Sequence, residues 1–470
     1  MAASALAGST LAGSTPAAPA APPSRAGSSW LSRWEPEDPV FWRETGARIA
    51  WRTLALTTAS LTLSFSTWFV MSALVVRLPA VGFKFDTMQL FWLAAMPGLA
   101  GGTLRVLHTF LVPIFGTRAV VAWATLAKLL PVAGLGFALL DPATPFWVFL
   151  VLSLLLGMGG GDFSSFMPST SLFFPKRLQG SVLGIQAGVG NFGVSLTQFV
   201  TPWIVGFGLF GSLAGGPQVF RKGEAVKQIW LQNAALWYVP LLLALGAACW
   251  IWLRSVPVKA SFREQLDIFK DKHTWFCTIT YVMTFGSFAG FSAAFPLLIK
   301  TVYGGFPGAP DPLKYAFLGP LVGSAARVLF GFVADRTGGG ILTQIAGTVM
   351  IAASGALVFG GYLAPTSLDQ FGGFVALMLV VFLFSGIGNA ATFRQFPVIF
   401  AHSPRQGAQV LGWTAAVAAY GPFVFSTLIG VAMSRTGSAA PFFLAAMGFY
   451  AAAVALNWWF YVRKGCERPS

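Results

Sequence analysis

The sequence has 470 residues, of which 56% are hydrophobic and only 10% are charged, whereas a typical soluble domain has roughly 25% charged residues. Its net charge of +15 comes without a basic face, a zinc-ligand spacing or an RNA-binding motif, which argues against a nucleic-acid partner. The three cysteines have no metal or disulfide spacing, and no catalytic or cofactor motif is present, so we expect neither an enzyme nor a metalloprotein.

The chain begins with a segment rich in Ala, Gly, Ser and Pro, and we predict that residues 1–33 form a disordered tail. A signal peptide needs a charged start followed by an apolar core, and this segment has neither. The next residues, from Trp30 to Arg48, resemble an interfacial lead-in to a first membrane span.

Runs of roughly 20 apolar residues recur along the rest of the chain and predict an all-α integral membrane protein. Charged or Gly/Pro-rich breaks divide them into about twelve spans, some long enough to require tilt. The predicted spans are 52–76, 86–113, 119–139, 146–174, 180–211, 230–253, 274–303, 312–336, 340–363, 371–400, 408–433 and 439–463.

A charged segment, residues 254–273, separates six spans from six. It predicts an N-terminal six-helix bundle over 34–253, a cytoplasmic linker, a C-terminal bundle over 274–463 and a short tail over 464–470. Lys and Arg are concentrated in the loops of one side, so the positive-inside rule places both termini in the cytoplasm. The cluster Arg221, Lys222 and Lys227 is an exception on the other side.

The two halves repeat each other. The pattern L-x-G-x-x-x-R-V ends in Arg105 and Val106 in the second span, and it recurs with Arg327 and Val328 in the eighth, 222 residues later. Two pseudo-symmetric halves of six spans around a central site are the architecture of the major facilitator fold.

Five charged residues fall inside the predicted spans, and each is a functional hypothesis because a charge costs roughly 2.5–3.5 kcal/mol at mid-membrane. Arg105 and Arg327 occupy equivalent positions, so a pseudo-twofold axis brings them face to face, and no acidic residue lies near either in the sequence. Two facing guanidinium groups favour a bound planar oxyanion, which can accept paired hydrogen bonds from both.

The other charges have less specific interpretations. Lys128 and Asp162 lie at comparable depth and are predicted to pair, although an Asp162 that carries a proton is an alternative. Arg394 suits a snorkelling side chain or a gate contact, and its role stays open. His108 is predicted to be a packed histidine, since no relay partner is evident near it.

The fifth span has a dense glycine pattern, GIQAGVGNFGVSLTQFVTP at 184–202, in which Asn191 offers both a donor and an acceptor. This segment closely resembles the signature of the nitrate/nitrite porters of the NarK type. Segments 161–176, 280–298 and 322–339 are also similar to that family, and the resemblance covers nearly everything from residue 34 onward.

The resemblance implies a secondary transporter that moves nitrate and nitrite by alternating access in the bacterial cytoplasmic membrane, most simply as a monomer that exchanges one anion for the other. Proton-coupled nitrate symport and transport of another small anion are the alternatives. The resemblance implies nine substrate-binding residues here, which are Arg105, Arg327, Asn191, Tyr281, Phe65, Phe163, Phe285, Gly188 and Gly190.

The sequence departs from the family in two places. The second signature, in the eleventh span, reads GWTAAVAAYGPFVFS, where alanines replace some of the glycines. Lys128 and Asp162 stand where related sequences have uncharged residues, which bears on coupling more than on substrate.

Overall fold

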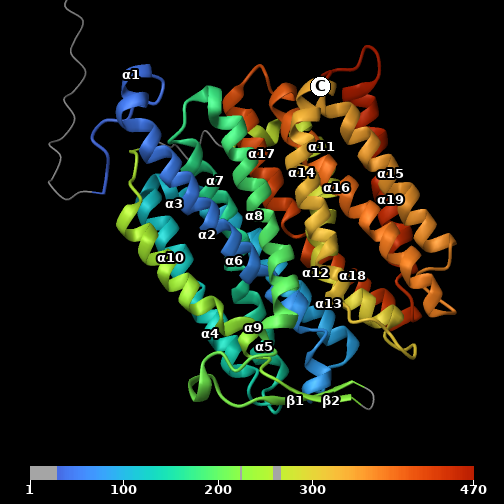
Figure 1. Cartoon of the computed structure of the whole chain (residues 1–470). Coiled ribbons are helices and arrows are strands. Elements are labelled where there is room, and N and C mark those ends of the chain that lie inside the picture. Colours follow the sequence, from blue (N-terminus) through green and yellow to red (C-terminus); the bar gives the residue numbers. More distant parts are fainter. Residues whose placement is uncertain (1–28, 223–224, 258–265) are drawn as a thin grey trace, which may run out of the picture.

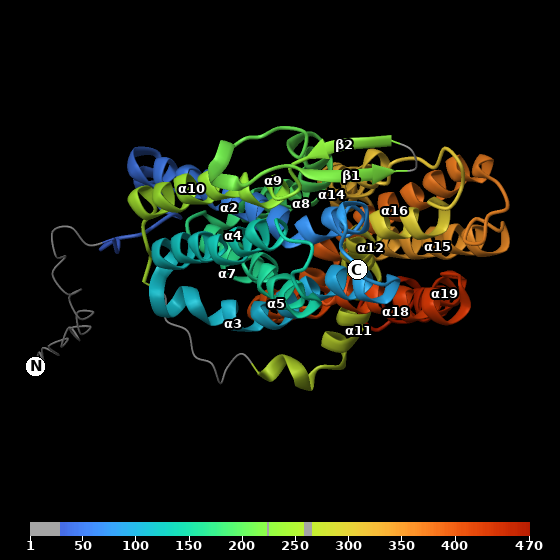
Figure 2. The same cartoon turned by 90° about the horizontal axis from the view of Figure 1, so that it is seen from below.

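The computed structural model describes residues 29–222, 225–257 and 266–470. Two helical bundles stand side by side in Figure 1, one coloured blue to green and the other yellow to red, and Figure 2 shows them from below. The first described residues pair with the end of the first bundle, because the Leu31 amide donates to the Ser255 carbonyl at 2.8 Å. Residues 1–28 of the predicted tail lie outside the described residues.

The first helix begins earlier than the predicted span 52–76, because the Asp38 side chain caps a helix at Pro39 and the helical chain then runs on to Leu74. A β-hairpin interrupts the half before its last helix. Its elements are α1 Pro39–Phe41, a π-helix Trp42–Gly46, α2 Ala47–Leu74, a 3-10 helix Leu78–Val81, α3 Thr87–Ala127, α4 Leu129–Ala138, α5 Phe146–Leu156, α6 Met158–Gly161, α7 Phe163–Ser171, α8 Lys176–Ile204, a 3-10 helix Gly211–Ala214, β1 Gln218–Lys222, β2 Ala225–Ile229, α9 Asn233–Leu236 and α10 Tyr238–Trp252.

The C-terminal half repeats this plan without the hairpin among its described residues. Its elements are a 3-10 helix Asp267–Lys270, α11 Lys272–Tyr281, a π-helix Val282–Gly286, α12 Ser287–Tyr303, α13 Leu313–Ala316, α14 Leu318–Thr337, α15 Gly339–Phe359, a 3-10 helix Leu368–Gln370, α16 Phe371–Ile399, α17 Pro404–Ala418, α18 Gly421–Thr436, α19 Ala440–Asn457 and a π-helix Trp458–Val462.

Ten helices in the described chain are long and apolar enough to cross a membrane. One of them, Thr87–Ala138, has 52 residues, which at 1.5 Å per residue is far longer than a bilayer is thick. It bends at Gly116, whose φ of 78° breaks the helical conformation. If its two arms are counted as separate spans and the 29-residue α8 is added, the number of spans becomes the predicted twelve. The number twelve stays a prediction.

Pairs of glycines at equivalent positions confirm that the halves are built alike. A Cβ on Gly193 would lie 2.2 Å from the Thr62 carbonyl oxygen, and a Cβ on Gly421 would lie 2.2 Å from that of Gly286. Gly116 and Gly338, which are 222 residues apart, both have positive φ, 78° and 87°. The same close approaches and the same turn therefore recur in each half.

The two halves are held together on the side of the molecule where the β-hairpin lies, at the bottom of Figure 1. There Arg77 forms an ion pair with Asp311, and the Lys300 Nζ donates to the Val76 carbonyl at 2.8 Å. Nearer the centre, the Ser195 hydroxyl donates to the Phe317 carbonyl at 2.9 Å. We call this side the hairpin side, and the side of residues 29–46 and the C-terminus the termini side.

The segment 464–470 folds back over the C-terminal half rather than extending away from it. The Gly340 amide donates to the Ser470 carbonyl at 3.0 Å, and Arg468 pairs with Asp271 at 2.9 Å. Hydrogen bonds from Lys272 and then His273 hold the pKa of Glu467 at about 2. These contacts join the segment to the starts of α11 and α15.

Candidate functional site

Arg105 comes from the middle of α3 and is fully buried. Its Nε donates to the Gly160 carbonyl at 2.8 Å, and its Nη1 donates to the Ala415 carbonyl of the other half at 2.6 Å. Its Nη2 is buried and has no hydrogen-bond partner in the described part of the chain. The carbonyls of Gly160 and Ala415 therefore fix the plane of the guanidinium group, and the N–H groups of Nη2 are left without an acceptor.

Arg327 comes from α14, at the equivalent position of the other half, and its side chain is also buried. Neither Nη1 nor Nη2 has a hydrogen-bond partner among the described residues, although both atoms are out of solvent. Leaving a buried polar group unpaired costs about 1–3 kcal/mol, and more when the group is charged. Three such nitrogens from two helices indicate a site for an anionic ligand.

Aromatic rings surround both guanidinium groups. The Arg105 guanidinium carbon lies 4.7 Å from the ring centre of Phe163, 5.4 Å from that of Phe285 and 5.7 Å from that of Trp68. The Arg327 guanidinium carbon lies 4.6 Å from the ring centre of Phe393 and 5.8 Å from that of Phe285. Both guanidinium groups therefore lie near the same ring, Phe285, which brings the two predicted site arginines into one neighbourhood.

Two further predicted residues have unused polar atoms. Tyr281 is buried, and it stacks on Phe285 with ring centres 5.5 Å apart and an interplanar angle of 12°. Its hydroxyl has no hydrogen-bond partner within the described ranges, and the same holds for both amide atoms of the fully buried Asn191. The Tyr281 hydroxyl is therefore available to a ligand beside the arginines, because Tyr281 stacks on the ring that lies near both of them.

Three of the predicted site residues have other neighbours. Phe65 stacks on Phe163 at 6.3 Å, behind the ring that contacts Arg105. A Cβ on Gly188 would lie 2.3 Å from a methyl carbon of Val328, and one on Gly190 would lie 2.8 Å from Leu61. Phe65 is thus a second layer of the aromatic cage, and the two glycines permit close helix packing.

Two aromatic residues at the site, Trp68 and Phe393, were not predicted. The repeat contains a signal for the second, because Phe163 and Phe393 stand on equivalent helices and cover equivalent arginines at 4.7 and 4.6 Å. An aromatic residue in a membrane span is otherwise indistinguishable from core.

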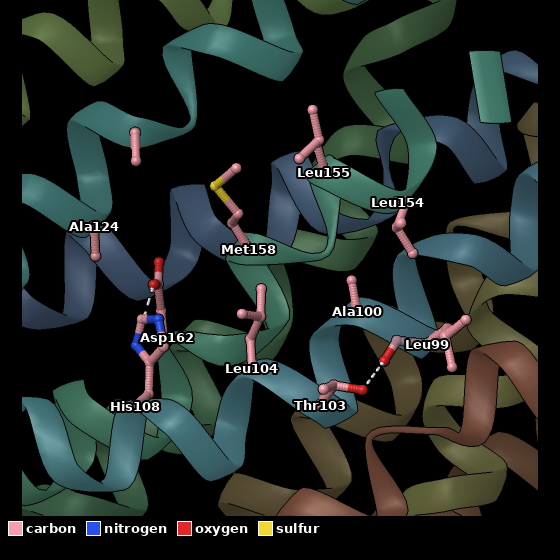
Figure 3. Close-up of a pocket in the computed structure, with 11 residues that line it drawn as sticks. Leu99, Ala100, Thr103, Leu104, His108, Ala124, Leu154, Leu155, Met158 and Asp162 are labelled. Carbon is pink, nitrogen blue, oxygen red and sulfur yellow. Dashed lines mark hydrogen bonds and ion pairs between the residues drawn. The ribbon is translucent and has the colours of Figure 1, made fainter. Parts of the chain in front are cut away.

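The buried charges Lys128 and Asp162 form the predicted ion pair. The Ser64 hydroxyl also donates to the Asp162 carboxylate, at 2.6 Å. His108 is buried, as the prediction of a packed histidine requires. It has polar neighbours that were not evident from the sequence, because its Nδ1 lies 2.9 Å from the Ser165 hydroxyl. The same nitrogen lies 3.8 Å from Asp162, and Figure 3 shows these two side chains together. The contacts of Ser64 and Ser165 were not foreseen, because each joins helices that are distant in the sequence.

A hollow of about 530 Å³ lies beside this cluster. Leucine and alanine side chains line most of it, and His108 and Asp162 lie along its wall, as Figure 3 shows. Neither arginine lines it, so it is separate from the anion site.

Arg394 lies near the end of α16 and pairs with Asp335 at 3.2 Å. The two side chains are 44% and 67% exposed. This geometry agrees with a surface ion pair at the termini-side ends of α14 and α16.

The described residues include no cluster of three or more His, Cys, Asp or Glu that could hold a metal ion.

Comparisons with known proteins agree with this geometry. A family model described as the Major Facilitator Superfamily matches residues 54–417. The chain is 60% identical to the probable nitrate/nitrite antiporter NarK2 of Thermus thermophilus over 442 residues, covering 94% of this chain and 98% of that protein. It is 37% identical to the nitrate/nitrite transporter NarU of Escherichia coli K12 over 458 residues, covering 92% of this chain and 96% of that protein.

Among solved structures, a bacterial homologue of the human lysosomal transporter Spinster, in an inward-facing and occupied conformation, matches with a TM-score of 0.60. The match covers 86% of this chain and 95% of that chain, at 14% sequence identity. The similarity confirms the major facilitator fold.

Proposed function

This chain belongs to the major facilitator superfamily and, within it, to the NarK-type nitrate/nitrite porters, and we propose that it exchanges nitrate for nitrite across the bacterial cytoplasmic membrane. The observation that carries the proposal is the set of three unpartnered, buried guanidinium nitrogens on Arg105 and Arg327. They belong to different halves of the molecule and contact one shared ring. A single small, planar anion fits between such donors.

The site also explains why the carrier exchanges anions. The two guanidinium groups repel each other when the site is empty, and no acidic side chain is paired with either in the described structure. Bringing the halves together around an empty site therefore costs free energy, because like charges in a low dielectric repel. A bound nitrate or nitrite offsets this repulsion, so the loaded carrier changes conformation more readily than the empty one.

Proton-coupled nitrate symport is the alternative, with Asp162 or His108 as the proton carrier. The contacts of Asp162 favour exchange, because its carboxylate already accepts from both Lys128 and Ser64. Nitrate uptake into proteoliposomes tests this directly. Exchange predicts uptake that needs internal nitrite and persists without a pH gradient, whereas uptake that needs the gradient and ignores internal nitrite would establish symport.

The proposed substrate class has its own test. Phenylalanine rings occupy the space around both arginines, which leaves little polar surface for a larger polyanion. Excess nitrite should therefore inhibit nitrate uptake, and sulfate or phosphate should leave it unchanged. Strong inhibition by phosphate would overturn the assignment. We further propose that the protein works as a monomer with both termini in the cytoplasm, as the loop charges favour.

A further inference from the structure

The proposed mechanism leaves the side chain of Asn389, on α16, without a role. This residue is fully buried, and both its Oδ1 and its Nδ2 have no hydrogen-bond partner in the described structure. A buried amide with two unsatisfied atoms costs about 1–3 kcal/mol for each group. A ligand bound beside this side chain would satisfy both atoms of its amide.

The position of Asn389 on its helix places it at the anion site. Asn389, Phe393 and Phe396 are spaced i, i+4 and i+7, so they lie along one face of α16. Phe393 lies 4.6 Å from the Arg327 guanidinium carbon, and both phenylalanines contact Tyr281, at 5.7 and 6.1 Å between ring centres. The face that carries Asn389 is therefore the face turned towards Arg327 and Tyr281.

The helix contacts next to Asn389 agree with this orientation. A Cβ on Gly386 would lie 2.1 Å from the Gly323 carbonyl, one turn before Arg327 on α14. Gln395 is the contrasting buried amide on the same helix, since it accepts from Thr343 at 2.9 Å and donates to Asn457 at 2.9 Å. One amide of α16 is satisfied by neighbouring helices, and the other is not.

The N-terminal half has no amide at the equivalent place. If Phe393 corresponds to Phe163, Asn389 corresponds to Gly159, where a Cβ would lie 2.1 Å from the Ser64 carbonyl. Among the described residues of that half, the buried amide with both atoms unsatisfied is Asn191, which comes from α8 instead. Each half therefore supplies one arginine and one free amide, but the two amides come from non-equivalent helices.

We propose that Asn389 is a substrate-binding residue whose Nδ2 donates to an oxygen of the bound anion and favours nitrate over nitrite. The inference rests on the proposed function. Nitrate has three oxygen atoms in a plane and nitrite has two, so a donor added beside the arginines and Tyr281 can reach a third oxygen only in nitrate. A site that donates to a group of one ligand discriminates against an analogue that lacks the group.

Purified protein in detergent tests this with two readouts, the melting temperature without ligand and the affinity for nitrate and for nitrite. Asn389→Leu should weaken nitrate binding by about tenfold, as expected for the loss of one hydrogen bond to a charged partner. Its effect on nitrite should be clearly smaller. The melting temperature of the ligand-free variant should stay the same or rise, because an unsatisfied buried group has been removed.

Gln395→Leu is the matched control, because it removes a satisfied amide from the same helix. It should lower the melting temperature, and the affinity of the folded fraction for nitrate should stay near that of the unchanged protein. Asn389→Asp keeps the shape of the side chain and places a carboxylate beside Arg327, so it should abolish nitrate binding while the protein still folds.

The outcomes separate the two proposals. If the unchanged protein binds neither nitrate nor nitrite, the proposed function fails. If it binds nitrate and Asn389→Leu binds nitrate equally well, or loses melting temperature as Gln395→Leu does, then Asn389 is a structural residue and this inference is overturned. An equal loss of nitrate and nitrite affinity would overturn the discrimination.

Discussion

At the scale of single residues, the two site arginines differ in what holds them. Arg105 uses two of its nitrogens to bind carbonyls, one of them across the interface between the halves, at Ala415. Both Nη atoms of Arg327 have no hydrogen-bond partner among the residues described. In the proposed mechanism Arg105 therefore binds the anion and also links the halves, whereas both Nη atoms of Arg327 are available to the anion.

This difference predicts the result of conservative substitutions. Arg105→Lys and Arg327→Lys should each raise the KM for nitrate by roughly ten- to a hundredfold, because a lysine keeps the charge but loses the planar fork. Arg105→Lys should also slow maximal transport, since it loses the bond to Ala415. Initial uptake rates at several nitrate concentrations give both constants, and near-normal uptake by either variant would contradict the clamp.

The candidate site residues with the clearest signal in the sequence are those whose side chains are unusual in a membrane span. The arginines stand out because a buried charge is costly, and the internal repeat places them opposite each other. Trp68 and Phe393 could not be identified in the same way, since aromatic residues are common in membrane cores. The role of Asn389 also depends on a count of hydrogen-bond partners, which needs three-dimensional coordinates.

At the scale of helices, the Lys128–Asp162 pair anchors the segment that contacts Arg105. In the sequence, Asp162 lies between Gly160 and Phe163. The Gly160 carbonyl accepts a hydrogen bond from Arg105, and the Phe163 ring covers the Arg105 guanidinium group. If Gly116 corresponds to Gly338, which have the same positive φ in the two halves, then Lys128 corresponds to Met350. If Phe163 corresponds to Phe393, then Asp162 corresponds to Thr392. Both equivalents are buried, so the C-terminal half packs the same place without an ion pair.

The equivalents supply the substitutions for a test. Lys128→Met alone should destabilise the protein by about 3–5 kcal/mol, because it leaves the Asp162 carboxylate buried and unpaired. Adding Asp162→Thr should recover most of that loss, since replacing both partners of a buried ion pair is often close to neutral. Thermal unfolding in detergent measures both effects, and a double variant as unstable as the single one would show that the pair itself is required.

Helix boundaries were predicted less well than helix content. The chain from Pro39 to Leu74 is helical throughout, although the sequence predicted a span only from residue 52. Charged residues such as Arg43 and Arg48 marked this region as polar, but they lie on exposed positions of a helix that continues past the apolar stretch. Hydropathy locates the membrane, whereas the hydrogen-bonded helix extends beyond it.

At the scale of the whole molecule, the closed hairpin side must open for the carrier to expose its site there. The Arg77–Asp311 ion pair and the Lys300–Val76 bond span the two halves at that point. Asp311→Asn should weaken this closure and increase the population that is open on the hairpin side. Asp369→Asn is the control, because Asp369 contacts Ser367 within its own loop at 3.3 Å.

Spin labels on the hairpin-side ends of α2 and α12 can report this change as a distance distribution. The Asp311 variant should show a larger fraction of long distances than the unchanged protein, and the Asp369 variant should not. Identical distributions in all three proteins would mean that the ion pair does not contribute to closure.

In the proposed mechanism, one monovalent anion bound between Arg105 and Arg327 permits the change of conformation. The most direct test is the flux stoichiometry in proteoliposomes loaded with labelled nitrite and placed in labelled nitrate. Exchange predicts that one nitrite leaves for each nitrate that enters. An imposed membrane potential should not change the exchange rate. Net nitrate uptake without nitrite release, or a rate that follows the potential, would contradict it.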